Sequence, residues 1–232
     1  MPASHAIPIR AVLWDLDGTL YRQPPLRKRM LFELGKAALK QSPKKTLRMM
    51  RWLRCYRHVR EELRDLGHAD SPLESIQFHV PAQRLETPVQ PLEDLVRYWM
   101  LEHPLPHLLK ARYAGAEGLL ERLQSKGIGL GVFSDYPVRE KLKALELDRF
   151  FSVQLGATDE TINAFKPHPR GFLEGCKALG WEPEEVVYVG DRDEVDGIGA
   201  RAAGMRCLII SDKQTGPGFV RDFDEIGRRL GV

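Results

Sequence analysis

Two aspartates directly follow an apolar run near the start of the chain, in the stretch AVLWDLDGTL at residues 11–20. The run at residues 11–14 predicts a short buried strand, because so apolar a segment fits a parallel sheet that is covered on both faces. Asp15 and Asp17 then lie at the carboxyl end of this strand, and Gly18 lets the chain turn away tightly. A simple turn and a metal or phosphate site explain this pattern equally well, so the other strand ends must decide between them.

Three later segments also place polar side chains at or beside the end of an apolar run. They are IGLGVFSD, AFKPHP and VVYVGDRDEVD, which carry Ser134, Lys166, Asp191 and Asp196. In a doubly wound sheet, ligands bind outside the carboxyl ends of the strands, so we expect these side chains to meet Asp15 and Asp17 there. Helix capping by the later aspartates and a solvated lysine are the alternatives, and they weaken when the segments are taken together.

Carboxylates that converge repel one another, and a bound cation relieves that repulsion. Because the predicted ligands are all oxygen atoms, the fitting ion is a hard one, and Mg²⁺ is the expected cofactor. Mg²⁺ readily accepts a phosphate oxygen, so a phosphorylated compound is the expected substrate. Lys166 and Ser134 would then hold further phosphate oxygens, which leaves one carboxylate free to attack phosphorus.

The elements that must position these residues alternate regularly from residue 116 onward. Apolar, strand-like segments take turns with helix-like ones, and the predicted strands lie within 128–135, 150–157, 184–191 and 205–210. Such alternation implies right-handed crossovers and a mainly parallel sheet. With a first strand at residues 9–15, the predicted fold class is α/β, a doubly wound, Rossmann-like core.

Residues 24–110 break this alternation and predict an inserted α-helical cap, so the core comprises residues 1–23 and 111–232. A helix over residues 46–64 would gather one apolar face, formed by Met49, Trp52, Tyr56, Val59 and Leu63, opposite Arg51, Arg54 and Arg57. A second helix is predicted at residues 92–103. The intervening residues 68–91 are rich in proline and polar residues, and we expect them to be partly irregular.

The chain divides sharply in charge. Of its 232 residues, 43% are hydrophobic, which is enough for a substantial buried core. Residues 22–64 hold 14 Lys and Arg but three acidic residues, a net charge of +11, which leaves −8 for the remaining chain. This division indicates two regions with different tasks, and it makes a strongly anionic substrate the expected one.

The cysteines and the N-terminus predict a cytoplasmic protein. Cys55, Cys176 and Cys207 lie far apart and outside any CxxC spacing, so we expect neither a disulfide framework nor a thiolate zinc site. The N-terminal MPASHAIPIR contains no long apolar segment behind a basic start, and no apolar run reaches the length of a membrane span. We therefore expect no leader peptide.

Four motifs follow one another along the chain: the DxDGT stretch, the strand-terminal serine, the lysine before proline and the GDxxxxD stretch. In this order they resemble the motifs of the haloacid dehalogenase-like hydrolase superfamily. The match covers residues 9–20 and 112–211, and the predicted cap resembles the helical kind that follows the first motif. The resemblance implies a magnesium-dependent phosphatase that acts on a small phosphorylated metabolite. Asp17 favours this reaction, since relatives that cleave carbon–halogen bonds generally lack the second aspartate.

The resemblance also implies a role for each motif residue. Asp15 would be the nucleophile that forms an aspartyl-phosphate, and Asp17 would protonate the leaving alcohol and then activate water. The implied holders of Mg²⁺ are the Asp15 carboxylate, the Asp17 backbone carbonyl and Asp191, with Asp196 close by or behind them. Ser134 and Lys166 would steady the phosphoryl group.

One residue departs from the pattern of many relatives, which place Asn or another neutral residue after the motif serine. This chain has Asp135 there. Pointing inward, its carboxylate would add negative charge beside a phosphate dianion, so we expect it to turn away or to bind backbone groups.

Two alternatives to a phosphatase stay open at this point. A phosphomutase of the β-phosphoglucomutase kind keeps the same core residues. A binding or regulatory module would instead use the basic cap to recruit nucleic acid or an anionic membrane surface. A solvated face with no ligand is the favoured interpretation of the arginines at 51, 54 and 57.

Overall fold

A computed structural model describes residues 7–67 and 71–232 of the chain. Residues 1–6, in the segment that we expect to hold no leader, and residues 68–70, within the segment expected to be partly irregular, lie outside this description. None of the described helices combines the length and the apolar character that crossing a bilayer requires.

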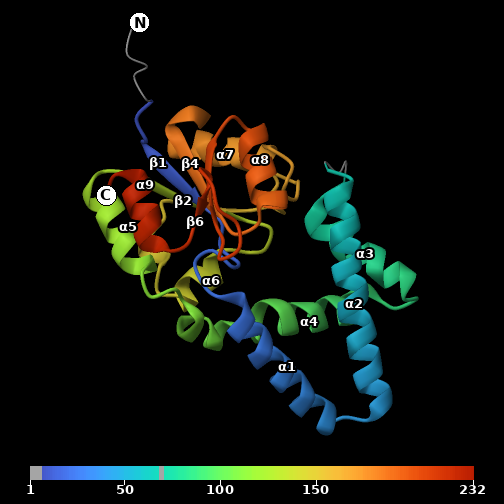
Figure 1. Cartoon of the computed structure of the whole chain (residues 1–232). Coiled ribbons are helices and arrows are strands. Elements are labelled where there is room, and N and C mark those ends of the chain that lie inside the picture. The colour runs from blue at the N-terminus through green and yellow to red at the C-terminus, as the bar shows by residue number, and fades with distance from the viewer. Residues whose placement is uncertain (1–6, 68–70) are drawn as a thin grey trace, which may run out of the picture.

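A six-stranded parallel sheet forms the centre of the fold (Figure 1). Its strands are β1 (Ala11–Trp14), β2 (Gly129–Ser134), β3 (Val153–Gly156), β4 (Val186–Gly190), β5 (Arg206–Ile210) and β6 (Phe219–Val220). They lie in the order β3-β2-β1-β4-β5-β6, and every neighbouring pair is parallel. The predicted doubly wound α/β fold is confirmed, and the chain adds the short edge strand β6, which the sequence pattern did not predict.

Helices cover both faces of this sheet. They are α5 (Ala116–Ser125), α6 (Arg139–Ala144), α7 (Arg170–Leu179), α8 (Ile198–Ala202) and α9 (Phe223–Leu230). Alternation along β1 sends Trp14 to the face where its ring stacks on Phe223 of α9, at 5.8 Å between centroids. Leu13 faces the other side, where a Cβ added at Gly175 of α7 would lie 2.5 Å from a Leu13 methyl carbon. Glycine therefore lets α7 pack closely on the strand that leads into Asp15.

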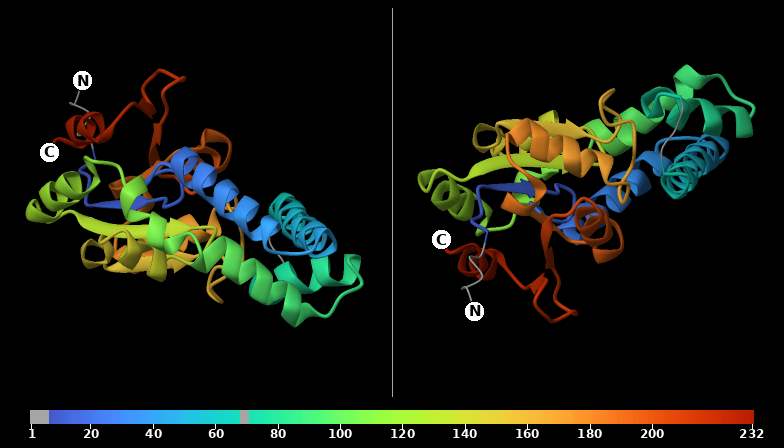
Figure 2. Two further views of the ribbon diagram at one scale, coloured as in Figure 1. Left: turned by 90° about the horizontal axis from the view of Figure 1, so that it is seen from below. Right: turned by 90° about the horizontal axis from the view of Figure 1, so that it is seen from above.

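In the described part of the chain, four α-helices follow β1 and precede α5, and we refer to them as the inserted helices. They are α1 (Gln23–Leu39), α2 (Pro43–Asp65), α3 (Leu73–Arg84) and α4 (Val89–Val96), which continues as a π-helical stretch over Arg97–Glu102. Figure 2 shows them extending to one side of the sheet and its covering helices. A separate apolar cluster holds them together, with Met49, Trp52, Tyr56, Phe78 and Leu92 among its members.

The predicted helix at residues 46–64 lies within α2, and the five residues of its apolar face are buried while Arg51, Arg54 and Arg57 are exposed. The expected irregularity is wrong for residues 73–84, which form α3 around an internal proline, Pro81. Proline removes one helical hydrogen bond, but burial of Leu73 and Phe78 on the same helix outweighs this cost.

The C-terminal residues complete the core. Strand β6 pairs with β5, and α9 packs against α5 through buried Phe223, Ile226 and Leu230. Removing the Phe223 ring would open a cavity between Trp14 and Tyr113, whose rings lie 5.8 and 5.4 Å from it.

We expect Phe223→Ala to lower the free energy of unfolding by about 3 kcal/mol or more, since truncation of a buried aromatic leaves a cavity. Denaturant unfolding of the variant measures this directly. Phe32→Ala is the matched control, because Phe32 is 55% exposed and its loss should change stability little. Equal destabilisation by both variants would contradict the assignment of α9 to the core.

Candidate active site

The first predicted carboxylate, Asp15, extends β1 by one residue toward the carboxyl edge of the sheet. Its backbone N–H donates to the carbonyl of Val189 at 2.8 Å, which ties the loop after β1 to β4. The chain then turns at Gly18, whose φ is +108°. A Cβ at this position would lie 2.0 Å from an Asp191 oxygen, so only glycine allows the two loops to touch.

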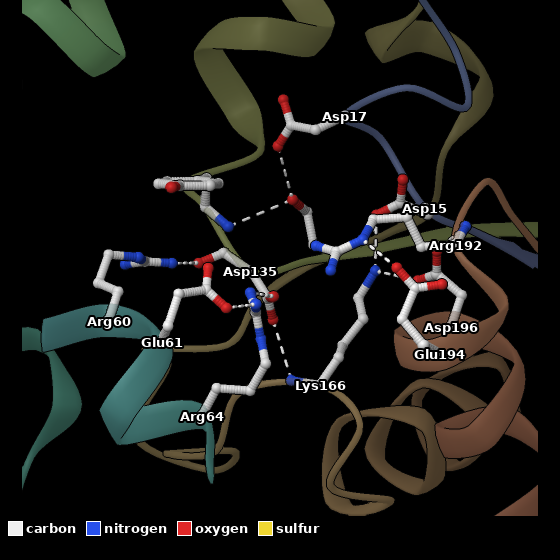
Figure 3. A network of polar contacts seen from close by, with 12 residues as sticks. Asp15, Asp17, Arg60, Glu61, Arg64, Asp135, Lys166, Arg192, Glu194 and Asp196 are labelled. Carbon is white, nitrogen blue, oxygen red and sulfur yellow. Dashed lines mark hydrogen bonds and ion pairs between the residues drawn. The ribbon is translucent and has the colours of Figure 1, made fainter. Parts of the chain in front are cut away.

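Lys166 lies at the centre of the site, and its side chain is 2% exposed. Its Nζ donates to Asp15 Oδ1 at 2.6 Å, to the Tyr188 hydroxyl at 2.6 Å and to Asp196 Oδ1 at 2.9 Å. All three donors of the ammonium are therefore used. Figure 3 shows the Asp15 and Asp196 carboxylates converging on this nitrogen.

Second contacts fix both of these carboxylates. The Thr19 hydroxyl donates to Asp15 Oδ2 at 2.9 Å. Asp196 Oδ2 accepts from the backbone N–H groups of Asp191 and Arg192, at 3.2 and 3.1 Å. Both carboxylate oxygens of Asp196 thus accept hydrogen bonds. These bonds orient Lys166 and the acidic loop that follows β4, residues 191–196.

Asp15, Asp191 and Asp196 form a group that could hold a metal ion, with ligand oxygens that all lie within 4.8 Å of one another. The donors are carboxylate oxygens alone, the set that hard divalent cations prefer. Burial and the charge of Asp196 raise the pKa of Asp191 to about 7. Lys166 alone therefore does not offset the acidic charge, and a bound cation fits this site.

The same excess of negative charge determines the pKa values at the centre of the site. Burial raises the pKa of Asp15 well above its usual range, Lys166 lowers it, and the neighbouring aspartates raise it further. Burial lowers the pKa of Lys166, but Asp15, Asp196 and Asp135 raise it by more, so the ammonium stays charged.

The second predicted carboxylate, Asp17, faces a different cation. Lys141 Nζ of α6 donates to its two oxygens at 2.5 and 2.8 Å, and the hydroxyls of Tyr21 and Ser134 also donate to it, Ser134 at 3.2 Å. Burial raises the pKa of Asp17, but the charge and hydrogen bonds of Lys141 lower it below its usual value. Its backbone carbonyl accepts from the Gln23 side-chain amide. The two aspartates of the DxDGT loop therefore have separate environments.

Asp135 turns away from the predicted metal group, in line with the expectation. One of its carboxylate oxygens accepts from the backbone N–H of Lys166 at 3.0 Å, and the other forms an ion pair with Arg64 of α2 at 2.8 Å. Its backbone carbonyl accepts from Arg60 of α2 at 2.8 Å. Figure 3 shows both arginines approaching Asp135 from the side opposite to the metal group.

Arg60 is 4% exposed and lies 4.1 Å from the ring centre of Tyr136 and 4.3 Å from that of Phe165. Such stacking suits a planar guanidinium and strengthens in a desolvated setting. The inserted helices are thereby joined to the loop that follows β2 and to the segment that leads into Lys166.

Sequence reasoning missed several residues that contact the site: Tyr21, Lys141, Tyr188, Arg60 and Arg64. Tyr188 was counted only as part of an apolar strand. Lys141 stands three residues after Val138 and four before Leu145, both buried, so helical spacing places it on the inward face of α6. That spacing could have revealed it, as it could have revealed Arg60 one turn from Tyr56.

Comparison with known proteins assigns the class. A sequence model of the haloacid dehalogenase-like hydrolases matches residues 9–204, and the chain belongs to this family of hydrolases. It is 30% identical over 209 residues to a glyceraldehyde 3-phosphate phosphatase from Methanopyrus kandleri, with 87% of this chain and 84% of that protein covered.

Two further relatives agree with the assignment. A phosphoglycolate phosphatase from Haemophilus influenzae is 37% identical over 101 residues, which are 42% of this chain and 43% of that protein. The crystal structure of an HAD phosphatase from Thermococcus onnurineus superposes with a TM-score of 0.64 at 29% identity, and covers 96% of this chain and 98% of that chain. The predicted family resemblance is confirmed.

The pKa of Asp191 is raised in the folded chain, so its ionised carboxylate destabilises the fold. We therefore expect a neutral replacement to increase the free energy of unfolding, by an amount that depends on pH. The pKa of Asp191 is about 7 in the folded chain against 3.8 ordinarily, so the folded chain binds this proton more tightly and loses stability as pH rises through this interval. In EDTA at roughly pH 8, we expect Asp191→Asn to be more stable than wild type by on the order of 2 kcal/mol. Urea unfolding across the pH range measures the difference.

Below the ordinary carboxyl pKa the two proteins should converge, because wild-type Asp191 is then protonated in both states. Asp148→Asn is the control, since Asp148 is exposed and far from this loop in sequence. A difference in the free energy of unfolding that does not change with pH would contradict the raised pKa of Asp191. So would an Asp191→Asn variant that is less stable than wild type at high pH.

The ion pair between Arg64 and Asp135 should contribute measurably to stability, because each side chain is 11% exposed. A double-mutant cycle with Arg64→Ala and Asp135→Ala should give a coupling energy of about 2 kcal/mol. The matched control is the Arg84–Glu62 pair on the inserted helices, whose side chains are 46% and 38% exposed. Its coupling should be much weaker, because solvent screens a pair this exposed.

Amide hydrogen exchange adds a second readout for the same pair. Asp135→Ala removes the acceptor of the Lys166 backbone N–H, so exchange at Lys166 should accelerate. Additive stability effects together with unchanged exchange would refute a link from α2 through Asp135 to the Lys166 backbone.

Proposed function

We propose that the protein is a magnesium-dependent phosphatase that hydrolyses a small phosphorylated metabolite through an aspartyl-phosphate on Asp15. The observation that carries this proposal is the convergence of Asp15, Asp191 and Asp196 within 4.8 Å, with Lys166 bound to two of them, at the carboxyl edge of the sheet. Membership of a hydrolase family and phosphatases among the relatives support the same reaction.

In the first step, a carboxylate oxygen of Asp15 forms a bond to phosphorus while the bond from phosphorus to the substrate oxygen breaks. The leaving oxygen takes the proton of Asp17 and departs as an alcohol. Lys141 holds Asp17 as a carboxylate in the substrate-free site, and the negative phosphate that approaches it would raise its pKa toward the protonated form.

In the second step, Asp17 accepts a proton from water as the water oxygen bonds to phosphorus. The bond between phosphorus and Asp15 then breaks and releases inorganic phosphate. Lys141 and Tyr21 favour the ionised form of Asp17 that this step requires. Ser134 would donate to a phosphoryl oxygen. Lys166, whose three donors already bind Asp15, Tyr188 and Asp196, would steady the phosphoryl group by its positive charge and would also offset the charge of Asp15.

Mg²⁺ would be held by Asp15, Asp191 and the Asp17 carbonyl, with Asp196 beside them and bound to Lys166. When bound, it neutralises phosphate charge and makes phosphorus more open to attack. Asp196 would act mainly by positioning Lys166 and the loop, because its oxygens already accept four hydrogen bonds.

We further propose that residues 24–110 act as a cap, with residues 1–23 and 111–232 as the core. Asp15 is 6% exposed and Lys166 is 2% exposed, and the inserted helices contact the neighbouring loop after β2 through Arg60 and Arg64, so movement of these helices would open a path for the substrate. Release of Arg60 and Arg64 from Asp135 would accompany opening, and their return would exclude water during the reaction.

The substrate is proposed to be small and strongly anionic. The named relatives act on glyceraldehyde 3-phosphate and phosphoglycolate, which makes these two compounds the first to test. The basic inserted helices favour a compound with a second anionic group, such as phosphoglycolate with its carboxylate, over the monophosphate of a neutral sugar such as glyceraldehyde 3-phosphate. The cytoplasm stays the predicted compartment.

The deciding experiment measures phosphate release from a panel of phosphorylated metabolites, with Mg²⁺ or with EDTA. We expect turnover that needs Mg²⁺ and that falls at least about a thousandfold in Asp15→Asn, because the nucleophile is lost. Asp65→Asn, at the exposed end of α2, is the control and should keep wild-type turnover.

Other outcomes would redirect the proposal. Phosphoryl transfer from a sugar bisphosphate without net phosphate release would identify a mutase. Absence of turnover on every compound, with salt-sensitive binding of anionic ligands that survives Asp15→Asn, would identify a binding module.

A further inference from the structure

The turn between α1 and α2 lies far from the sheet (Figure 1), and the two helices that it joins carry exposed apolar side chains. Leu39 closes α1 and is 89% exposed, and Leu47 in the first turns of α2 is 72% exposed. Leu31, Phe32 and Met50 on the same two helices are also exposed. We call these five residues the apolar tip.

The part of the apolar tip on α1 is a second face of that helix, not a poorly packed core. The helix buries no residue fully, and its partly covered side chains include Leu26, Met30 and Leu34. Phe32 comes four residues after Lys28, and Leu39 comes seven residues after Phe32, so the three lie along one exposed stripe on the opposite side of the helix. A helix with apolar residues on both faces has one face left for a partner.

Positive charge surrounds the apolar tip. Residues 27–57 contain eleven Lys and Arg, all exposed, and a single acidic residue, Glu33. Lys36, Lys40, Lys44, Lys45 and Arg48 lie closest in sequence to the turn. The cations also approach the apolar side chains directly, since Lys36 Nζ lies 4.7 Å from the centre of the Phe32 ring.

We propose that the apolar tip docks on an anionic phospholipid bilayer, with its leucines inserted among the headgroups and its lysines and arginines on the lipid phosphates. Exposed leucines within a dense basic surface match the two attractions that such an interface offers. A nucleic acid would satisfy the cations but not the leucines. A second copy would cover the leucines but bring two strongly basic surfaces together.

The location of the tip separates docking from chemistry. It belongs to the turn of the inserted helices that points away from the sheet, whereas Arg60 and Arg64, which contact the core, lie toward the other end of α2. Docking would therefore leave the contacts around Lys166 and Asp135 unchanged. The inference goes beyond the proposed phosphatase activity and does not depend on it.

Flotation of the full chain with lipid vesicles tests the proposal. Vesicles of phosphatidylcholine alone should leave the protein unbound, and vesicles with added phosphatidylglycerol should carry it upward, less so as salt is raised. The double variant Leu39→Gln, Leu47→Gln should reduce partitioning about tenfold or more, because each leucine loses its favourable transfer from water. Leu66→Gln, 73% exposed at the opposite end of α2, is the matched control and should bind like wild type.

Three results would overturn the proposal. They are absence of binding to the anionic vesicles, undiminished binding by the double variant, and a concentration-dependent dimer in light scattering that the double variant converts to monomer. Asp15→Asn should float with the vesicles as well as wild type does. Its flotation thus tests docking separately from phosphatase activity, which can fail without affecting the result.

Discussion

Compensation of buried negative charge is the constraint on which the rest of the structure depends. The carboxyl edge of the sheet gathers three carboxylates that are largely removed from water, and one lysine pairs with two of them. Charges in such surroundings persist only when hydrogen bonds and opposite charges replace the lost water. The Thr19 hydroxyl, the Tyr188 hydroxyl and the backbone of the acidic loop provide those bonds.

The same rule separates the two aspartates of the DxDGT loop. Asp15 shares its lysine with another carboxylate and has a raised pKa, whereas Asp17 has Lys141 to itself and a lowered one. Two chemically identical side chains, two residues apart, are thus prepared for different proton affinities by different neighbours. The fold achieves this by pairing each aspartate with a different lysine, Asp15 with Lys166 and Asp17 with Lys141.

The parallel, doubly wound sheet and the residues at its strand ends could be predicted, because parallel strands bring their carboxyl ends to one edge whatever the details of packing. Lys141, Arg60 and Arg64 could not be assigned partners in this way. Their role depends on which loop a helix reaches, and a basic residue on a helix is usually solvated. Irregularity was wrongly expected around Pro81 because local composition does not register the buried face that stabilises α3.

The contact between Gly18 and Asp191 also bears on how the site is assembled during folding. One residue follows β1 and the other follows β4, with the inserted helices and most of the core between them in the chain. Contacts of such long sequence separation cost loop-closure entropy and form slowly. A chain with its helices in place but without the pairing of β1 and β4 therefore has no complete site, so catalytic competence reports that the whole core has folded.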